Sequence, residues 1–570
     1  MERFSTRAFA GVLLALVLSG CALLDGGAES SPNGTASASP TAPDKTTERP
    51  EPGAENVDYV LPLTKLSVPL ADASNITVYN YSLGDADIVN TIGRPVPAPL
   101  AGIIAVPTTP GPHPLIIFLH GQMPVQSIAD PVYQGFDYAV QQMAAQGYVA
   151  ISVNINVNYS FEFGESAQDA WAYQILTKHL ESLAAANSGA TPLVVTQESG
   201  GEPEELDLTG KIDLKNISLV GHSRGGEVAD MAYRYDRQAG FSRIKSIVHI
   251  AATVAIFDEP RPDIPTGIIL PELDGDVDNL AQMIFDDNLE LAAQRNSFTN
   301  LVFLRGANHN FFNRAFTPDD RFSGKGPANL DDQTTWLTRE QQEDFLKRYL
   351  TAFYLQLSDP QATISNFDPA QAQPTSMFGL PVVASTAFPG AIRVIPIAQQ
   401  GMEQQSLEQQ GVTATGSATV NWYRQTFPAA MVTTGFFNHP GALARPSQAV
   451  DLYQITWGHS LFDSQAPLPE TETPSVTIPL TVTDWQGYKA LSLFIAVDST
   501  TGYNIQNADQ SLIIEINDAS GQSWSVLAPV GTPALTGNQG WFEEIEDFGG
   551  SVTIWRGYTP LGELRIPLEQ

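Results

Sequence analysis

The pentapeptide Gly221-His222-Ser223-Arg224-Gly225 constrains the fold of this chain more than any other feature. It follows the apolar run 217–220 and precedes a stretch, 226–232, with helical spacing. A sharp strand-to-helix turn pushes the serine Oγ clear of the sheet, and small neighbours let strand and helix pass close together. The helix start adds backbone N–H groups and a positive dipole end. We predict that Ser223 is a nucleophile, with a purely structural turn as the alternative.

The N-terminus predicts export. A short arginine-bearing head precedes an apolar run, 8–18, that is too short to span a bilayer comfortably. Leu18-Ser19-Gly20-Cys21 resembles a bacterial lipobox, in which the cysteine is lipidated and becomes the mature N-terminus. Cys21 is the single cysteine of the chain, so disulfides explain it poorly. We predict a lipoprotein signal peptide over 1–20 and lipidation at Cys21; the alternative is an ordinary signal peptide with an incidental cysteine.

The mature chain is therefore expected outside the cytoplasm, lipid-anchored to a bacterial membrane at the cell surface or in the periplasm. The stretch 28–56 is rich in Ser, Thr, Pro, Gly, Ala and Glu, and we predict a disordered tether over 21–56. The formal net charge is −33, which opposes nucleic-acid phosphates and anionic lipid surfaces. We expect no nucleic-acid partner, and membrane contact through the lipid anchor at Cys21.

Strands and helices alternate between residues 57 and 359. Strands are predicted at 76–81, 100–106, 115–119, 148–153, 217–220, 244–250, 267–270 and 300–304, and helices at 133–145, 168–186, 226–232, 286–294 and 338–357. The leading strands are expected to be antiparallel, and the polar stretch 188–210 is expected to be a surface excursion. The alternation predicts an α/β domain over 57–359 with a doubly wound, mostly parallel sheet.

The pattern of apolar and polar residues changes after Asp359. Short alternating apolar segments with Gly, Asn and Pro turns predict an antiparallel β-sandwich domain over 360–570. Six of the eight tryptophans lie in this part. We expect most of them in the core, and keep glycan or polymer contact by this domain as a second hypothesis.

A nucleophilic serine needs a histidine to take its proton and a carboxylate to hold that histidine. Seven of the eight histidines are poorly placed to act as this base. They are predicted in turns, helices or buried strands, within the pentapeptide, in the second domain, or ahead of the nucleophile in the chain. These are His113, His120, His179, His222, His249, His439 and His459. His309 remains, in a loop directly after the last strand of the first domain. The carboxyl ends of strands carry the site in open α/β sheets, so we predict His309 as the base.

The acid is expected between nucleophile and base, at another strand end. The run Pro271-Glu272-Leu273-Asp274-Gly275-Asp276 follows a predicted strand, with Pro271 at its first turn position. Asp274 is the predicted acid and Asp276 the alternative. The run also resembles the opening of a calcium loop, but Asn279 and Phe285 stand where that loop needs Gly and Glu. We expect no metal and no organic cofactor.

Two backbone N–H groups must stabilise the oxyanion. We predict those of Arg224, next to the nucleophile, and of Gln122, in the loop after the strand 115–119. The Arg224 side chain could contact a substrate carboxylate, although such an arginine is more often held in a local ion pair.

This arrangement resembles the α/β-hydrolase superfamily over about Val57 to Asp359, in the order Ser, Asp, His and in the pentapeptide. Gly221–Gly226 is similar to the cutinase-like, platelet-activating-factor-acetylhydrolase-like and chlorophyllase-like branches. The acid loop departs from the family, because Pro271 stands where glycine is common. The resemblance implies a serine esterase or lipase that cleaves small-molecule or polymeric esters through an acyl-enzyme. The alternatives are a catalytically inactive surface binding protein on this fold and a serine peptidase.

Overall fold

The computed structural model describes residues 57–89, 93–123, 125–159, 166–254, 261–277, 279–320, 335–359, 361–395, 404–425, 450–457, 473–482, 484–497, 509–537, 540–547, 550–557 and 561–568. All of them lie in one compact unit, Glu51–Gln570. The predicted signal peptide (1–20), Cys21 and the tether (21–56) lie outside the described residues and stay predictions. Within the described ranges, no helix has the length and apolar character needed to cross a bilayer.

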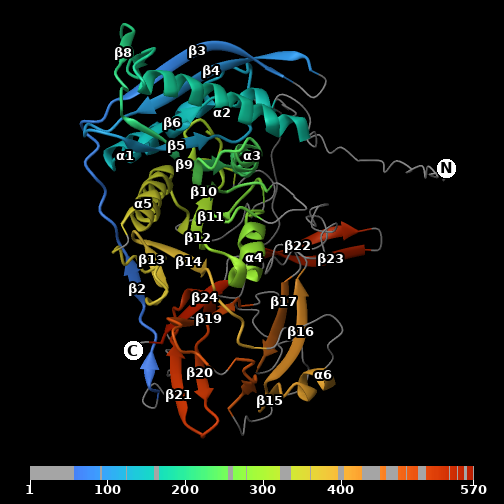
Figure 1. Cartoon of the computed structure of the whole chain (residues 1–570). Helices are drawn as coiled ribbons and strands as arrows, with labels where there is room; N and C mark the ends of the chain where they lie inside the picture. The colour runs from blue at the N-terminus through green and yellow to red at the C-terminus, as the bar shows by residue number, and fades with distance from the viewer. Residues whose placement is uncertain are drawn as a thin grey trace, which may run out of the picture. The chain divides into compact units, whose positions relative to one another are not determined.

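A mixed sheet of 13 strands organises this unit, in the order β2-β13-β14-β12-β11-β10-β9-β5-β6-β4-β3-β7-β8 (Figure 1). Its strands are β2 (Thr64–Leu66), β3 (Val78–Val89), β4 (Pro95–Ala105), β5 (His113–Leu119), β6 (Val149–Val153), β7 (Leu193–Gln197), β8 (Glu204–Leu206), β9 (Ile212–His222), β10 (Ile244–Ile250), β11 (Thr266–Leu273), β12 (Thr299–Asn308), β13 (Pro374–Met377) and β14 (Leu380–Ala387).

The centre of the sheet is parallel and its flanks are largely antiparallel. Strands β12, β11, β10, β9, β5 and β6 run parallel to one another. Antiparallel pairs join β14 to β12 on one side and β4 to β6 and β3 on the other. The α/β class is confirmed, but the prediction of a mostly parallel sheet is corrected to a mixed one. Flanking strands that follow each other directly pair antiparallel, since a parallel pair needs a long crossover. Strands β7 and β8 form inside the predicted polar excursion.

Helices cover both faces of this sheet (Figure 1). They are α1 (Asp137–Ala145), α2 (Ser166–Asn187), α3 (Arg224–Gln238), α4 (Gln282–Glu290) and α5 (Arg339–Ser358). Phe118 and Val220 point to the face covered by α1 and α5. Their chain neighbours Ile117 and Leu219 point to the face covered by α2 and α3. Because side chains alternate along a strand, continuous apolar strands such as β5 fill two cores at once, and the sheet is doubly wound as predicted.

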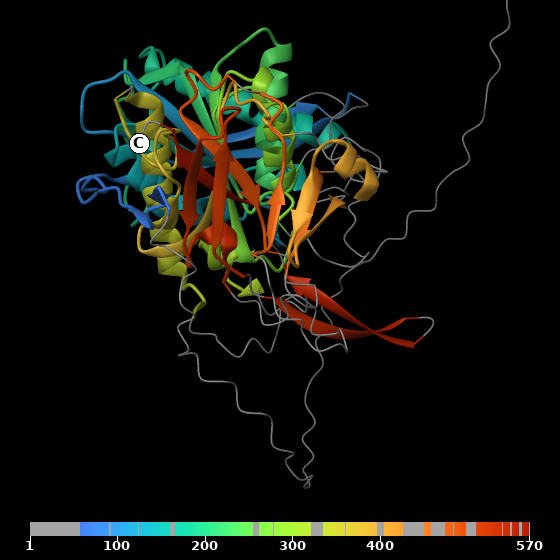
Figure 2. The same ribbon diagram turned by 90° about the horizontal axis from the view of Figure 1, so that it is seen from below.

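Strands beyond the predicted boundary at residue 359 join the central sheet. β14 pairs antiparallel with β12 over Thr299 to Leu304, so residue 359 does not coincide with an edge of the sheet. The described strands that follow pair only in separate sheets of two or three, including the twisted β22–β23 ribbon in red in Figure 2. The predicted β-sandwich over 360–570 is therefore not confirmed.

The remaining elements complete the described chain. They are β1 (Tyr59–Val60), α6 (Gln404–Gln409), β15 (Thr413–Thr415), β16 (Thr419–Gln425), β17 (Val450–Thr456), β18 (Ser475–Thr477), β19 (Ala490–Ile495), β20 (Leu512–Asn517), β21 (Ser523–Ala528), β22 (Gly540–Asp547), β23 (Gly550–Gly557) and β24 (Gly562–Pro567). The small sheets are β1-β21-β20, β15-β18, β16-β17, β19-β24 and β22-β23.

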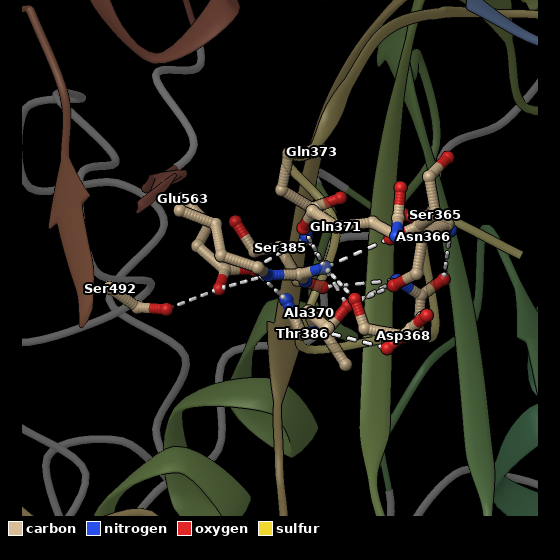
Figure 3. A network of polar contacts seen from close by, with 12 residues as sticks. Ser365, Asn366, Asp368, Ala370, Gln371, Gln373, Ser385, Thr386, Ser492 and Glu563 are labelled. Carbon is tan, nitrogen blue, oxygen red and sulfur yellow. Dashed lines mark hydrogen bonds and ion pairs between the residues drawn. The ribbon is translucent and has the colours of Figure 1, made fainter. Parts of the chain in front are cut away.

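A buried ion pair ties β24 to the sheet (Figure 3). The Arg565 guanidinium lies 2.8 Å from the Glu563 carboxylate, and both side chains are fully buried. Glu563 accepts hydrogen bonds from the Thr386 backbone N–H of β14 (2.8 Å) and the Ser492 hydroxyl of β19 (2.6 Å). Arg565 donates to the carbonyl oxygens of Ser365, Asp368 and Gln371. The C-terminal strand is thus part of the structure that supports β14.

Candidate active site

Ser223 lies at the turn between β9 and α3 and is 2% exposed. Its φ of 54° and ψ of −129° fall where non-glycine residues are rarely found, at a cost on the order of 1–3 kcal/mol. Hydrogen bonds hold this conformation: the Ser223 N–H donates to the Ile250 carbonyl (3.0 Å), and its carbonyl accepts from the N–H groups of Gly226 (3.0 Å) and Thr253 (3.1 Å). The strand, turn and helix stand where the sequence predicts them.

The glycines beside the turn are required by close packing. A Cβ on Gly221 would lie 2.3 Å from the Gly225 carbonyl oxygen. One on Gly225 would lie 2.2 Å from the Leu119 carbonyl oxygen of β5. Any side chain at these positions would force β5, β9 and α3 apart, so the small residues of the pentapeptide have a direct steric cause.

His309 and Asp274 form a buried pair. Nδ1 of His309 lies 3.1 Å from Oδ1 of Asp274, and the two side chains are 0% and 1% exposed. Asp274 also accepts backbone N–H bonds at 3.0–3.2 Å from its own loop, at Asp276, Val277 and Asn279. This loop fixes the carboxylate, which in turn orients the imidazole and directs its other nitrogen away from the acid.

Strand β11 ends later than the sequence predicts. Pro271 is not a turn residue: it pairs with Leu304 of β12, and the strand continues past a register shift to Leu273. Proline is tolerated in strands at such irregularities. Asp274 is consequently the first residue after β11, and His309 the first after β12.

Asp276 lies on the other side of the same imidazole. Its Oδ2 is 3.5 Å from Nε2 of His309, and its side chain is 56% exposed. Nε2 makes no hydrogen bond within the described residues. Asp274 is buried and on Nδ1, whereas Asp276 is exposed and beside the nitrogen that a nucleophile would need. This geometry favours Asp274 over Asp276 as the candidate acid.

The charges around His309 outweigh its burial. Burial alone would lower the pKa of His309, but Asp274, Asp276 and Asp320 raise it to about 9. Burial would raise the pKa of Asp274, but the His309 charge and the hydrogen bonds hold it below its usual value. In this arrangement His309 is protonated at neutral pH, so a reaction that uses it as a base speeds up as pH rises.

His222 connects the turn to the His309 loop. Its Nε2–H donates to the His309 carbonyl (2.9 Å), and the two ring centroids are 4.9 Å apart. Burial lowers the pKa of His222 to about 3, so it stays neutral. Because His222 precedes Ser223, this contact holds the His309 loop against the turn at Ser223. Ser223, Asp274 and His309 thus stand at the carboxyl ends of β9, β11 and β12, where open α/β sheets carry their sites.

The loop after β5 touches the turn. A Cβ on Gly121 would lie 2.5 Å from Cβ of Ser223, so the Gly121 backbone packs closely against the Ser223 side chain. Nη1 of Arg224 donates to Oε1 of Gln122 (2.8 Å), and the guanidinium lies 5.1 Å from the centroid of the Tyr159 ring. These side chains tie together the two residues whose backbone N–H groups are the predicted oxyanion donors. That role stays a prediction, as does contact between Arg224 and a substrate carboxylate.

The other described histidines are engaged elsewhere. His113 begins β5 rather than lying in a turn, and His120, His179 and His249 are buried. His439 and His459 lie outside the described residues. Two residues that contact the site were not singled out from the sequence, Tyr159 and Asp320; neither stands in a motif, and only the fold brings them there. In the part of the chain that the structure describes, no cluster of three or more His, Cys, Asp or Glu could hold a metal ion.

No protein-family model and no curated protein matches the sequence. Three solved structures are similar over about half of this chain. A protein assigned as a dienelactone hydrolase from Klebsiella pneumoniae subsp. pneumoniae MGH 78578 is 14% identical, with 49% of this chain and 99% of that chain covered and a TM-score of 0.29. A ferulic acid esterase from Streptomyces cinnamoneus is 12% identical, with 52% and 93% covered and a TM-score of 0.30. An esterase from Pyrobaculum calidifontis is 16% identical, with 45% and 83% covered and a TM-score of 0.28.

Proposed function

We propose that this chain is a serine hydrolase that cleaves carboxylic esters through Ser223, His309 and Asp274. The observation that carries the proposal is the strained Ser223 at a strand-to-helix turn, with the buried His309–Asp274 pair held against that turn by His222. A serine kept at positive φ costs stability, which a purely structural turn could avoid with glycine.

In the proposed acylation, Oγ of Ser223 attacks the ester carbonyl carbon while Nε2 of His309 takes the hydroxyl proton. Asp274 holds the imidazole and stabilises the imidazolium that forms. The backbone N–H groups of Gln122 and Arg224 stabilise the oxyanion. As the tetrahedral intermediate collapses, the ester C–O bond breaks and His309 gives its proton to the departing alcohol oxygen. The product is an acyl group on Ser223.

Deacylation repeats these steps with water. His309 takes a proton from water as the water oxygen attacks the acyl carbon, and the bond to Oγ breaks. The proton returns to Ser223 and the carboxylic acid leaves. Each proton removed is returned within one cycle, so the sequence balances without metal or redox chemistry.

The proposed location follows from the N-terminal sequence. Lipidation of Cys21 would anchor the protein to a bacterial membrane outside the cytoplasm, and the tether 21–56 would separate the enzyme from the lipid. The substrate would be a small-molecule or polymeric ester, with glycan or polymer contact by the C-terminal region as a further hypothesis. Mass spectrometry of the mature N-terminus should find Cys21 carrying lipid. A mature protein whose N-terminal peptide carries no lipid would contradict lipid anchoring.

The test of the activity is hydrolysis of a p-nitrophenyl ester series against aminoacyl amides. We expect ester hydrolysis that is lost in Ser223→Ala. Ser188→Ala is the control and should keep the activity, because Ser188 is an exposed serine outside the Ser223 turn. Faster cleavage of amides than of esters would favour a serine peptidase. A folded wild-type protein without either activity would favour a binding protein on a hydrolase-like fold.

A further inference from the structure

Asp320 joins the two loops that carry the proposed acid and base. Its Oδ2 accepts hydrogen bonds from the backbone N–H groups of Gly275 (2.8 Å) and His309 (3.1 Å). Its Oδ1 accepts from the N–H of Asn310 (3.0 Å). Gly275 directly follows Asp274, and His309 is the proposed base itself. One carboxylate therefore holds the backbone of both loops at the reacting residues.

This carboxylate is buried, with Asp320 only 5% exposed. Burial raises its pKa, while the His309 charge and the hydrogen bonds from Asn310 and Gly275 oppose that rise. Hydrogen bonds to an ionised group are roughly twice as strong as those between neutral groups. Because Asp320 accepts three such bonds from two loops, it fixes the spacing between those loops.

We propose that Asp320 is a positioning residue that sets His309 against Asp274, an inference that rests on the proposed serine hydrolase function. The Nδ1–Oδ1 hydrogen bond of that pair is 3.1 Å long and spans two separate loops. A relative shift of about 1 Å would break it, and misplacements of that size cost about 100-fold in rate. Because Asp320 holds both loops, they move together and the pair keeps its alignment.

The Asp320 charge also acts on the base. Asp274 and Asp276 face His309 from the loop after β11, and His222 faces it from β9. Asp320 adds to the two carboxylates that raise the pKa of His309, although less than either of them. Removing its charge lowers the pKa of His309 directly, and a looser His309–Asp274 pair lowers it further.

Asp320→Asn keeps the shape of the side chain but removes its charge. It also replaces one acceptor oxygen with an NH2 group, which cannot accept a hydrogen bond from a backbone N–H. We expect kcat on the alkaline plateau, where His309 is neutral in both proteins, to fall about 10- to 100-fold, with KM changed less than about threefold. The acid limb of the pH profile should move to lower pH. Asp263→Asn is the matched control, because Asp263 also accepts backbone N–H bonds (Asn296 and Ser297, 3.1 Å each) but precedes β11, at its opposite end.

The proposal is overturned if Asp320→Asn keeps both the wild-type kcat and the wild-type acid limb, or if Asp263→Asn changes them equally. A second readout is independent of activity: NMR titration of selectively labelled histidine should place the His309 pKa lower in Asp320→Asn than in the wild type. If Ser223→Ala and Asp320→Asn both keep full esterase activity, the proposed function is wrong. The histidine titration still tests whether Asp320 acts on His309. If Asp320→Asn does not fold, amide exchange in the wild type replaces it as the test. Slow exchange of the Gly275, His309 and Asn310 N–H groups supports the positioning role of Asp320, and exchange as fast as in exposed loops overturns it.

Discussion

The ion pair between Asp276 and His309 gives the most specific expectation for activity. Asp276 lies 3.5 Å from Nε2 of His309 and is more than half exposed. Two unit charges at that distance interact by about 1 kcal/mol in water and about 5 kcal/mol at an effective dielectric constant of 20. Since exposure screens the pair, the lower figure applies, and it corresponds to slightly less than one pKa unit.

Asp276→Asn should therefore make the proposed enzyme more active at neutral pH. With a His309 pKa of about 9, only about 1% of the molecules carry the neutral base at pH 7. Lowering that pKa by just under one unit raises the neutral fraction, and with it kcat/KM, roughly fivefold to tenfold. Above about pH 10 the variant and the wild type should converge, because His309 is then neutral in both.

The assay is the pH dependence of kcat/KM for a neutral ester, which reports the pKa of the free enzyme. Asp207→Asn, which removes one charge from an exposed residue between β8 and β9, controls for the overall negative charge. An unchanged acid limb in Asp276→Asn would refute the ion pair. Loss of activity at every pH in Asp276→Asn, with activity kept in Asp274→Asn, would make Asp276 the acid instead.

Four further outcomes are expected. Asp274→Asn should lower kcat about 1,000- to 10,000-fold at every pH, since the amide no longer selects the imidazole tautomer. Folding stability should decrease between about pH 6.5 and pH 9, because the raised His309 pKa favours the folded state only while His309 is protonated; thermal melts of the wild type should show this decrease and those of Asp274→Asn should not. Gly225→Ala should destabilise the fold by about 1–3 kcal/mol or more, measured by urea unfolding, because its Cβ meets a backbone carbonyl of β5 at 2.2 Å. Arg565→Met should cost about 3–5 kcal/mol by leaving Glu563 buried without its cation, and adding Glu563→Gln should recover much of that loss.

The sequence predicted the parts of the site that depend on local chain order. The apolar run before Ser223 and the glycines around it predict a strand, a turn and a helix, and the structure has β9, the turn and α3 there. His309 follows β12 as predicted, although the strand does not end at the apolar run but continues through Gly306 to Asn308. Local patterns of this kind are fixed by steric and burial constraints within a few residues.

Features that depend on contacts between distant segments could not be predicted. Nothing near Asp320 marks it as a partner of Gly275 and His309, because the hydrogen bonds go to backbone atoms that every residue has. The predicted boundary after Asp359 relied on a change from helical spacing to short alternating segments, which does not reveal that β14 pairs with β12. A proline at 271 indicated a turn, although a register shift lets the strand continue past it.

Covalent labelling with a fluorophosphonate shows directly whether Ser223 is the nucleophile. The protein is treated with a fluorophosphonate at pH 9 and digested with trypsin, and the adduct is located by fragmentation within the peptide 216–224, which contains Ser218 and Ser223. We expect one phosphonate per protein, on Ser223, at a rate that falls sharply in His309→Ala. An adduct on another serine, or none in a folded protein that hydrolyses esters, would show that Ser223 is not the nucleophile.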